Sequence, residues 1–251
     1  MLRGAVSIFR RDMLVMRRSI FSELLAVVAY PLTLYFVFGI GMKGYISAVD
    51  GIPYQVFIAP GLISMTAVNA AFDESAWSMW FHRRVQHTIE EYRTAPITTY
   101  DIVIGKIFSG FAQGGIKGIA VAAVILGFTS FRAPLPNLLA YLLFIAGGSM
   151  IFSCLGTVIG TMIDKPENIG RFQAVVIIPL IFMSGVFFSL SAYPPSLLPL
   201  IRMLPTTAIF DGARVALLTG RIDMASLAVV TVTALVAFAG TVYCFNRKIA
   251  E

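Results

Sequence analysis

The stretch LLAYLLFIAGGSMIFSCLGTVIGTMI, residues 138–163, runs for 26 residues without a charged side chain. A helix needs about 20 mostly apolar residues to cross a hydrocarbon core of about 30 Å, at about 1.5 Å a residue. This stretch is therefore long enough to span a membrane. The whole chain has a similar character, because 58% of its 251 residues are hydrophobic and only 13% are charged, against about 25% charged in soluble domains.

Five further stretches have the same length and polarity, so the sequence predicts an all-α membrane protein with six transmembrane helices in a single domain over residues 1–251. The regular alternation of polar and apolar residues that marks membrane strands is absent. The predicted spans are residues 24–42, 56–80, 107–128, 138–163, 172–190 and 225–245.

The positions of lysine and arginine predict the orientation, because cytoplasmic flanks carry an excess of both. With the N-terminus inside, thirteen of the nineteen lie on cytoplasmic flanks and five on outer flanks, while Lys117 lies within a span. Both termini are therefore expected in the cytoplasm of a bacterial cell. The net charge of +6 then reflects topology and attraction to membrane lipid, and it does not imply nucleic-acid binding.

Residues 1–20 predict a basic amphipathic helix ahead of the first span. Apolar residues recur at helical spacing on one face, and Arg3, Arg10 and Arg17 lie on another. A helix of this kind usually lies in the membrane interface. Docking to a specific partner is the alternative.

The connection between the second and third spans is more highly charged than a simple turn. Val85, Ile89 and Tyr92 recur at i, i+4 and i+7 before Pro96, so residues 84–96 predict a short amphipathic helix outside the lipid. Its mixed charge suits a groove on a soluble partner, and a helix lying on lipid is the alternative. Its charged and polar surface is formed by Arg84, His87, Glu90, Glu91 and Arg93.

A helix start follows this connection. Thr98 and Asp101 have the spacing of a capping box, which predicts a new helix that continues into the third span.

The long outer connection, residues 191–219, contains apolar pieces that are too short to cross a bilayer. Such pieces predict interfacial or re-entrant helices, with Thr206 or Thr207 as a helix cap. The region is a candidate outer gate, with Tyr193, Pro194, Pro205, Asp211 and Arg214 as its candidate residues.

Three ionisable residues fall inside predicted spans, where charge is costly and often functional. Asp73 and Glu74 lie in the second span and Lys117 lies in the third, at depths that allow them to meet. A buried ion pair is the simplest interpretation. Snorkelling towards the headgroups and lining of a substrate path are the alternatives.

Two stripes of glycine predict close helix packing, either within the chain or between two copies of it. Gly110, Gly114 and Gly118 recur every four residues in the third span, as do Gly156 and Gly160 in the fourth.

The sequence lacks the residue patterns of a phosphate-binding loop and of a metal site. Gly105 and Lys106 lack the upstream glycine and the following serine or threonine of a phosphate-binding loop. The two histidines and two cysteines are not spaced as metal ligands. We therefore expect no catalytic residue, no metal site and no cofactor in this chain.

Several segments together resemble the ABC-2 type transporter permeases. The six spans, the cytoplasmic termini and the two long connections are shared with that family. The quoted segments also look like the branch that holds the nodulation lipo-oligosaccharide exporter permease and its bacterial relatives. These segments are FIAPGL (57–62), IEEYRTAPI (89–97), DIVIGK (101–106), PLIFMSGVFF (179–188), LPTT (204–207) and DGAR (211–214).

The resemblance implies a permease subunit of an ATP-driven exporter in the bacterial cytoplasmic membrane. It implies a homodimer that binds two ATPase subunits, which carry ATP and Mg²⁺. Residues 84–96 would then form the coupling helix that contacts the ATPase and ends at Pro96, and a turn containing Asp164 and Glu167 would be a second contact. Residues 191–219 would close the outer end of the path. The substrate would be a lipid, a glycolipid, a sugar-linked molecule or an amphipathic small molecule.

The sequence is also compatible with a second class of function. An ion- or proton-coupled secondary transporter or channel would use Asp73, Glu74 and Lys117 as its ion site. That class predicts transport by the chain alone, without an ATPase.

Overall fold

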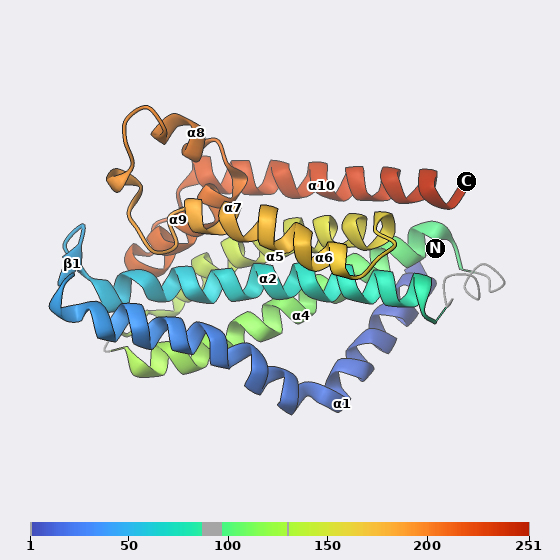
Figure 1. The fold of residues 1–251 in the computed structure, drawn as a ribbon, viewed down its shortest axis with the longest axis horizontal. Coiled ribbons are helices and arrows are strands. Elements are labelled where there is room, and N and C mark those ends of the chain that lie inside the picture. The colour runs from blue at the N-terminus through green and yellow to red at the C-terminus, as the bar shows by residue number, and fades with distance from the viewer. Residues whose placement is uncertain (1, 87–96, 130, 251) are drawn as a thin grey trace.

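The computed structural model describes residues 2–86, 97–129 and 131–250, and helices make up most of this part of the chain (Figure 1). A short hairpin of β1 (Ala48–Val49) and β2 (Ile52–Pro53) joins the first two long helices. The long helices are α1 (Leu2–Leu34), α2 (Tyr54–Arg84), α4 (Thr99–Phe128), α5 (Leu135–Met162) and α10 (Met224–Ala250). The shorter ones are α6 (Glu167–Phe172), α7 (Ile178–Met183), α8 (Leu198–Arg202) and α9 (Pro205–Thr219). Among the described residues, five helices are long and apolar enough to cross a membrane.

The predicted interfacial helix and the first predicted span form one continuous helix. α1 is bent into two diverging arms (Figure 1), and it continues through a π-helical turn, Tyr35–Ile40, towards the hairpin. Ser22 Oγ donates to the Ser19 carbonyl oxygen at 2.8 Å, and back-bonding of this kind bends helices. The arm before the bend packs on α4, where Ala5 and Ile8 are buried.

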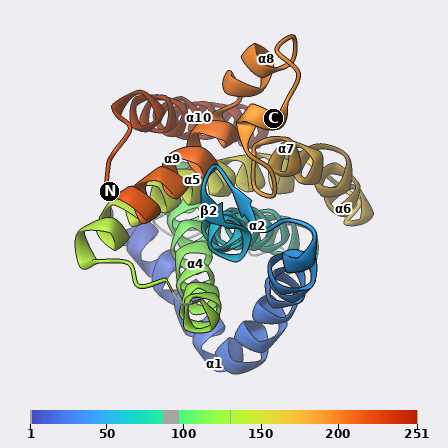
Figure 2. The same ribbon diagram turned by 90° about the vertical axis from the view of Figure 1, so that its left-hand side faces the viewer.

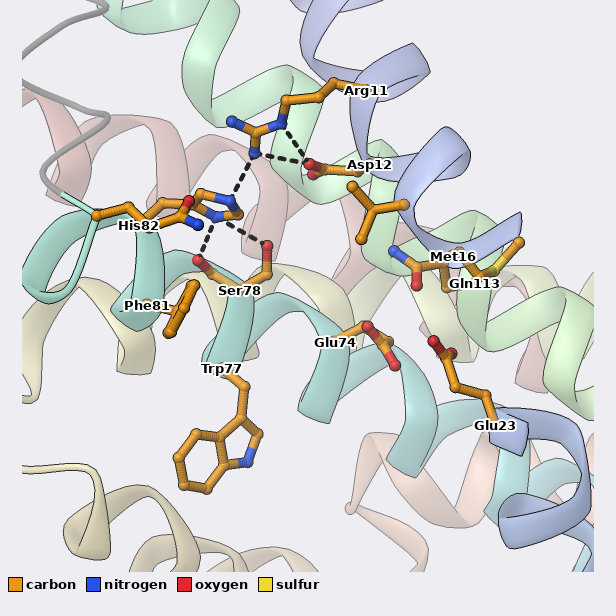
Figure 3. Close-up of a pocket in the computed structure, with 12 residues that line it drawn as sticks. Arg11, Asp12, Met16, Glu23, Glu74, Trp77, Ser78, Phe81, His82 and Gln113 are labelled. Atoms are coloured by element: carbon orange, nitrogen blue, oxygen red, sulfur yellow. Dashed lines mark hydrogen bonds and ion pairs between the residues drawn. The ribbon is translucent and has the colours of Figure 1, made fainter. Parts of the chain in front are cut away.

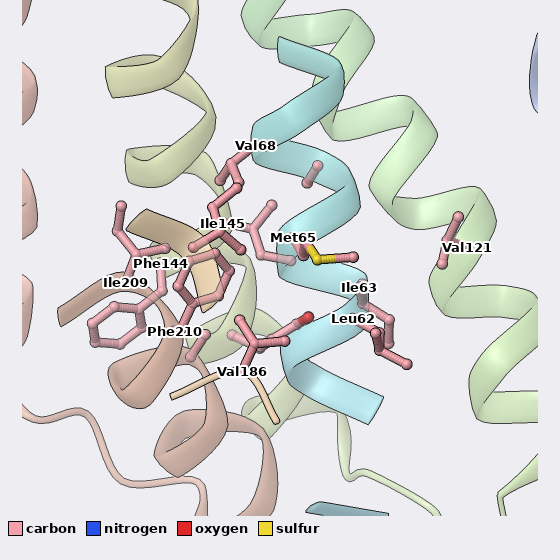
Figure 4. Packing of buried hydrophobic residues seen from close by; sticks show 14 of the residues in the cluster. Leu62, Ile63, Met65, Val68, Val121, Phe144, Ile145, Val186, Ile209 and Phe210 are labelled. Carbon is pink, nitrogen blue, oxygen red and sulfur yellow. The ribbon is translucent and has the colours of Figure 1, made fainter. Parts of the chain in front are cut away.

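α2 is the central helix of the molecule. It lies between α1 and α4 on one side and α5, α7 and α9 on the other (Figure 2). Its buried side chains meet those of three neighbours in one apolar cluster (Figure 4). The contributing residues include Leu62, Ile63, Met65 and Val68 from α2, Val121 from α4, Phe144 and Ile145 from α5, and Ile209 and Phe210 from α9.

Both glycine stripes make contacts inside one copy of the chain, and both pack against α2. A Cβ atom added to Gly114 would lie 2.6 Å from the Ala67 carbonyl oxygen, and one added to Gly118 would lie 2.7 Å from Ala67 Cβ. Gly156 and Gly160 of α5 approach the α2 backbone in the same way. Small residues therefore allow α4 and α5 to sit directly on the α2 backbone.

The segment predicted as the fifth span, residues 172–190, differs from the other five. It is helical only from Glu167 to Met183, with a π-helical turn, Gln173–Ile177, between α6 and α7. At about 1.5 Å a residue this is roughly 25 Å long. The helix stops because Gly185 has a φ of +83°, a left-handed conformation that suits glycine and ends helices. The residues that follow Gly185 form a loop, and Arg214 of α9 contacts its start.

The five long helices run along the longest axis of the molecule, and the shorter segment from α6 to α7 runs back towards the hairpin end before α10 returns (Figure 1). The start of α1 and the end of α10 therefore lie at the same end, opposite the hairpin (Figure 1). We refer to it below as the terminal end.

The two predicted helix starts have different outcomes. Thr98 caps α4 as predicted, since its Oγ1 accepts from the Asp101 amide at 3.2 Å while Asp101 Oδ2 accepts from the Thr98 amide at 3.1 Å. The prediction of Thr206 or Thr207 as a cap is wrong, because α9 already begins at Pro205. Proline is favoured in the first turn of a helix, where its missing N–H costs nothing.

Candidate functional site between α1, α2 and α4

A cavity of about 500 Å³ lies between α1, α2 and α4 (Figure 3). Both arms of the bent α1 contribute to it, and one face of α2 forms the opposite wall. The lining residues are Arg11, Asp12, Val15, Met16 and Glu23 from α1, Glu74, Trp77, Ser78, Phe81 and His82 from α2, Gln86 just after α2, and Gln113 from α4.

A buried ionic network closes one end of the cavity. Lys106 has only 1% of its side chain exposed, and its Nζ lies 2.8 Å from Asp12 Oδ2 and 2.7 Å from Ser78 Oγ. Arg11 Nη2 lies 2.7 Å from Asp12 Oδ1 and 2.8 Å from His82 Nε2. The network thus joins α1, α2 and α4 near the ends of α2 and α4 that flank the predicted coupling helix.

His82 has polar neighbours at both ring nitrogens. Nδ1 lies 2.6 Å from the Ser78 carbonyl oxygen and 2.9 Å from Lys106 Nζ, while Nε2 lies 2.8 Å from Arg11 Nη2. The imidazole ring therefore links α2 to the cations of α1 and α4.

A second ionic cluster lies deeper along α2. Lys117 Nζ pairs with Glu74 Oε1 and lies 3.0 Å from Glu23 Oε2. The structure thus brings together two members of the predicted trio, Glu74 and Lys117. It places the third elsewhere, because Asp73 Oδ2 accepts from Gln173 Nε2 at 3.1 Å. Glu23 of α1 is the partner that the sequence did not suggest.

The predicted second ATPase contact is joined to the end of α2. Arg83 Nη1 and Nη2 both lie 3.2 Å from Asp164 Oδ1, and Arg84 pairs with the same oxygen. Trp80 Nε1 donates to the Asp164 carbonyl oxygen at 2.9 Å. Hydrogen bonds from Arg84 and then Arg83 hold the pKa of Asp164 below its ordinary value. Glu167 begins α6 three residues further on.

Most of the predicted coupling helix falls outside the described residues. Only residues 84–86 of its range 84–96 are described. The residues named for ATPase contact that lie outside are His87, Glu90, Glu91, Arg93 and Pro96.

At the other end of the molecule, Arg214 of α9 holds the loop that follows α7. Its Nε lies 3.2 Å from the Phe57 carbonyl oxygen, and its Nη2 lies 3.1 Å from that of Val186 and also contacts that of Gly185. The guanidinium carbon sits 3.9 Å from the centre of the Phe57 ring. Asp211 Oδ1 is 3.6 Å from Arg214 Nη1. These two predicted gate residues therefore meet α2 and the loop after α7.

The remaining predicted gate residues do not contact Arg214 through any bond between described residues. Tyr193 Oη donates to the Met183 carbonyl oxygen at 3.1 Å. The Pro194 carbonyl oxygen accepts from the Leu197 amide at 3.0 Å. Pro205 begins α9.

The sequence interpretation missed Asp12, Glu23, His82 and Gln113 of the cavity, and it missed Lys106, which pairs with Asp12. One signal was available for Asp12, since it is the only acidic residue among the first twenty. It also shares a helical face with Ile8 and Met16, which are buried. Across the described ranges 2–86, 97–129 and 131–250, no three His, Cys, Asp or Glu side chains are arranged to hold a metal ion.

Comparison with known proteins identifies relatives over most of the chain. The ABC-2 type transporter family matches residues 4–218. The inner membrane transport permease YadH of Escherichia coli K12 is 33% identical over 184 residues, which cover 73% of this chain and 71% of the relative. Nodulation protein J of Rhizobium meliloti is 27% identical over 83% of this chain and 79% of the relative. Its counterpart in Bradyrhizobium diazoefficiens is 26% identical over 97% and 93%.

Proposed function

Because the chain belongs to the ABC-2 type transporter family, a family of membrane permeases, we propose that it works as a homodimer coupled to two separate ATPase subunits in an ATP-driven exporter. Its relative YadH is named an inner membrane permease. We place this chain likewise in a bacterial inner membrane, with both termini in the cytoplasm. The ATPase subunits carry ATP and Mg²⁺, and this chain performs no chemistry of its own.

The observation that carries the coupling proposal is the set of bonds between Asp164 and the end of α2. Arg83 and Arg84 hold the turn before α6 against the end of α2, where the proposed coupling helix begins. Both proposed ATPase contacts thus start from one place at the terminal end. A push on either would be shared by α2 and by the segment from α6 to α7.

The ionic network of Lys106 extends this coupling to α1. Residues 84–96 lie between α2 and α4, and Lys106 of α4 pairs with Asp12 of α1. Closure of the ATPase dimer would therefore move three helices together. ATP supplies the bias by binding one conformation of the complex more tightly than the other.

Five long apolar helices and the shorter apolar segment from α6 to α7 are the basis for proposing six membrane crossings. We assign the segment from α6 to α7 as the fifth crossing and residues 191–219 as re-entrant helices at the outer end. Tyr193, Pro194, Pro205, Asp211 and Arg214 would belong to the outer gate. The substrate is a lipid, a glycolipid, a sugar-linked molecule or another amphipathic molecule that the apolar interior tolerates.

A pull-down tests the proposal directly. Tagged protein would be purified from its native membrane in mild detergent, and the eluate assayed for ATP hydrolysis. We expect a co-purifying ATPase. A single-component eluate that moves ions in liposomes would overturn the proposal and favour a secondary transporter or channel built on Asp73, Glu74 and Lys117.

The coupling helix gives the first variant to test. We expect the Glu90→Ala, Glu91→Ala double variant to separate ATP hydrolysis from transport in the reconstituted complex, because the two carboxylates would contact the ATPase. The control is Asp50→Asn, which removes a carboxylate charge in the β1–β2 turn and keeps a residue type that tolerates the positive φ of this position. Equal transport per ATP hydrolysed in the double variant and the wild type would contradict the assignment.

A further inference from the structure

The charged groups around the cavity are unequally accessible. The Glu23 and Glu74 side chains are 30% and 27% exposed, whereas that of Lys117, which pairs with both, is 6% exposed. Two carboxylates thus share one buried ammonium, and they are the accessible part of the cluster (Figure 3). This part of the cavity carries one excess negative charge.

The other cluster at the cavity has the opposite composition, because the Arg11 guanidinium and the buried Lys106 ammonium share the single carboxylate of Asp12. Arg11 is also bonded to His82, so an anion would have to compete with Asp12 for these groups. The preference for a cation therefore applies to the end of the cavity that Glu23 and Glu74 form.

Two aromatic rings extend the acidic wall. Trp77 and Phe81 are each 41% exposed, although they line a cavity in a membrane protein. They follow Glu74 at i+3 and i+7, so all three side chains lie along one face of α2. A carboxylate next to aromatic rings attracts an organic cation, because the ring faces carry negative partial charge.

Gln113 supplies a polar group that a ligand could reach. It is only 6% exposed and lines the cavity from α4 (Figure 3). Its amide makes no hydrogen bond to any residue within the described ranges. The amide atoms are not among the fully enclosed polar atoms that lack a partner, so they are open to the cavity and the oxygen can accept a hydrogen bond from a ligand.

We propose that this cavity binds the head of an amphipathic organic cation, a molecule with one delocalised or quaternary positive charge and an apolar body. Glu74 and Glu23 supply the counter-charge, Trp77 and Phe81 supply ring faces, and Gln113 accepts from a polar N–H or O–H of the ligand. A cavity of about 500 Å³ lies within the usual range for small-molecule sites. The claim that the bound cation is the transported substrate rests on the proposed function, whereas the claim that the cavity binds such a cation does not.

The site lies on one side of the membrane. Glu74 is ten residues from the end of α2 at Arg84, which corresponds to about 15 Å along the helix. With the terminal end in the cytoplasm, the ligand enters from the inner leaflet or the cytoplasm.

The test measures binding to the permease alone in lipid nanodiscs, with empty nanodiscs subtracted. The probes are radiolabelled tetraphenylphosphonium and tetraphenylborate, two ions of nearly equal size and opposite charge. We expect saturable binding of tetraphenylphosphonium and none of tetraphenylborate. Glu74→Gln should weaken the affinity at least tenfold, and Trp77→Ala about threefold or more.

Two controls keep the result interpretable. Asp50→Asn removes a carboxylate charge in the β1–β2 turn, outside the cavity, and should leave binding unchanged. Trp77→Ala truncates a partly exposed side chain that has no part in the ionic cluster, so it tests the site even if Glu74→Gln fails to fold. Because no ATPase is present, failure to bind would leave the pull-down result untouched.

Three outcomes would overturn the inference. These are equal binding of the two probes, preferential binding of tetraphenylborate, and an unchanged tetraphenylphosphonium affinity in Trp77→Ala together with folded Glu74→Gln. The second outcome would indicate a site for anionic headgroups centred on Arg11.

Discussion

Lys106 shows how a single residue depends on one partner. Its ammonium is almost fully buried, and Asp12 is the carboxylate that faces it. A buried charge that loses its counter-ion is strongly destabilising, whereas replacement of both members of a pair by apolar residues is often tolerated. Substitution of Asp12 alone is therefore expected to destabilise the protein more than substitution of both residues.

The prediction is that Asp12→Leu lowers the free energy of unfolding by about 3–5 kcal/mol. The Asp12→Leu, Lys106→Met double variant should recover most of this loss, because the buried ammonium is gone and Arg11, which also loses Asp12, is partly exposed. Denaturant titration of the purified protein in detergent measures both. Arg10→Ala, on an exposed position of the same helix, is the control. A double variant less stable than Asp12→Leu would show that the pair is not the source of the effect.

Arg214 was predicted from the sequence as a gate residue, and its role in holding backbone segments together is visible only in the tertiary contacts. Its guanidinium binds three backbone carbonyl oxygens from two separate segments. The planar donor set of arginine suits this task, whereas the ammonium of lysine does not match it. Sequence identified the residue as a gate candidate but gave no reason to expect these partners.

At the scale of elements, the contact of α4 with α2 depends on the glycine stripe. Neighbouring glycines provide a matched pair for testing it. A Cβ atom on Gly114 would lie 2.6 Å from both the Ala67 carbonyl oxygen and Ala71 Cβ, whereas one on Gly115 would have no atom within 4 Å. Both positions lie inside α4, so the two substitutions differ mainly in what the new methyl group meets.

We predict that Gly114→Ala lowers the free energy of unfolding by about 1–3 kcal/mol, the usual cost of overpacking. Gly115→Ala should leave it unchanged or raise it by up to about 1 kcal/mol, because alanine favours the helix over glycine. Thermal unfolding of the two variants in the same detergent provides the comparison. Equal stability of the two would mean that the α2–α4 contact relaxes without cost.

The elements were predictable where the signal is local. Apolar length identified α2, α4, α5 and α10, and the Thr98 capping box identified where α4 begins. The end of the helix after Met183 was not predictable, because residues 172–190 remain apolar past it. The helix ends there through the conformation of Gly185 and the capture of its carbonyl oxygen by Arg214.

At the scale of the whole molecule, Asp164 links two distant parts of the chain at the terminal end. It joins the turn before α6 to Arg83 and Arg84, some 80 residues earlier. Asp164 is exposed, so its ion pairs add little to stability. Their role in our proposal is to transmit movement from the ATPase.

Asp164→Ala should therefore reduce transport by the reconstituted complex while leaving unfolding within about 0.5 kcal/mol of the wild type. Lys165→Ala, a neighbouring exposed residue without a bond to α2, should have no such effect. Transport and ATP hydrolysis would be measured in the same proteoliposomes. Normal transport by Asp164→Ala would remove the turn from the coupling route.

The sequence by itself determined that this chain is a helical membrane protein with long apolar helices and closely packed glycine faces. These properties are fixed by side chains within a few turns of one another. Only the tertiary structure decided which charges meet. Lys106 and Asp12 are 94 residues apart, and Lys117 and Glu74 are 43 apart. The cavity exists because α1 bends away from α2 and α4, and no local pattern encodes the space that three helices leave between them.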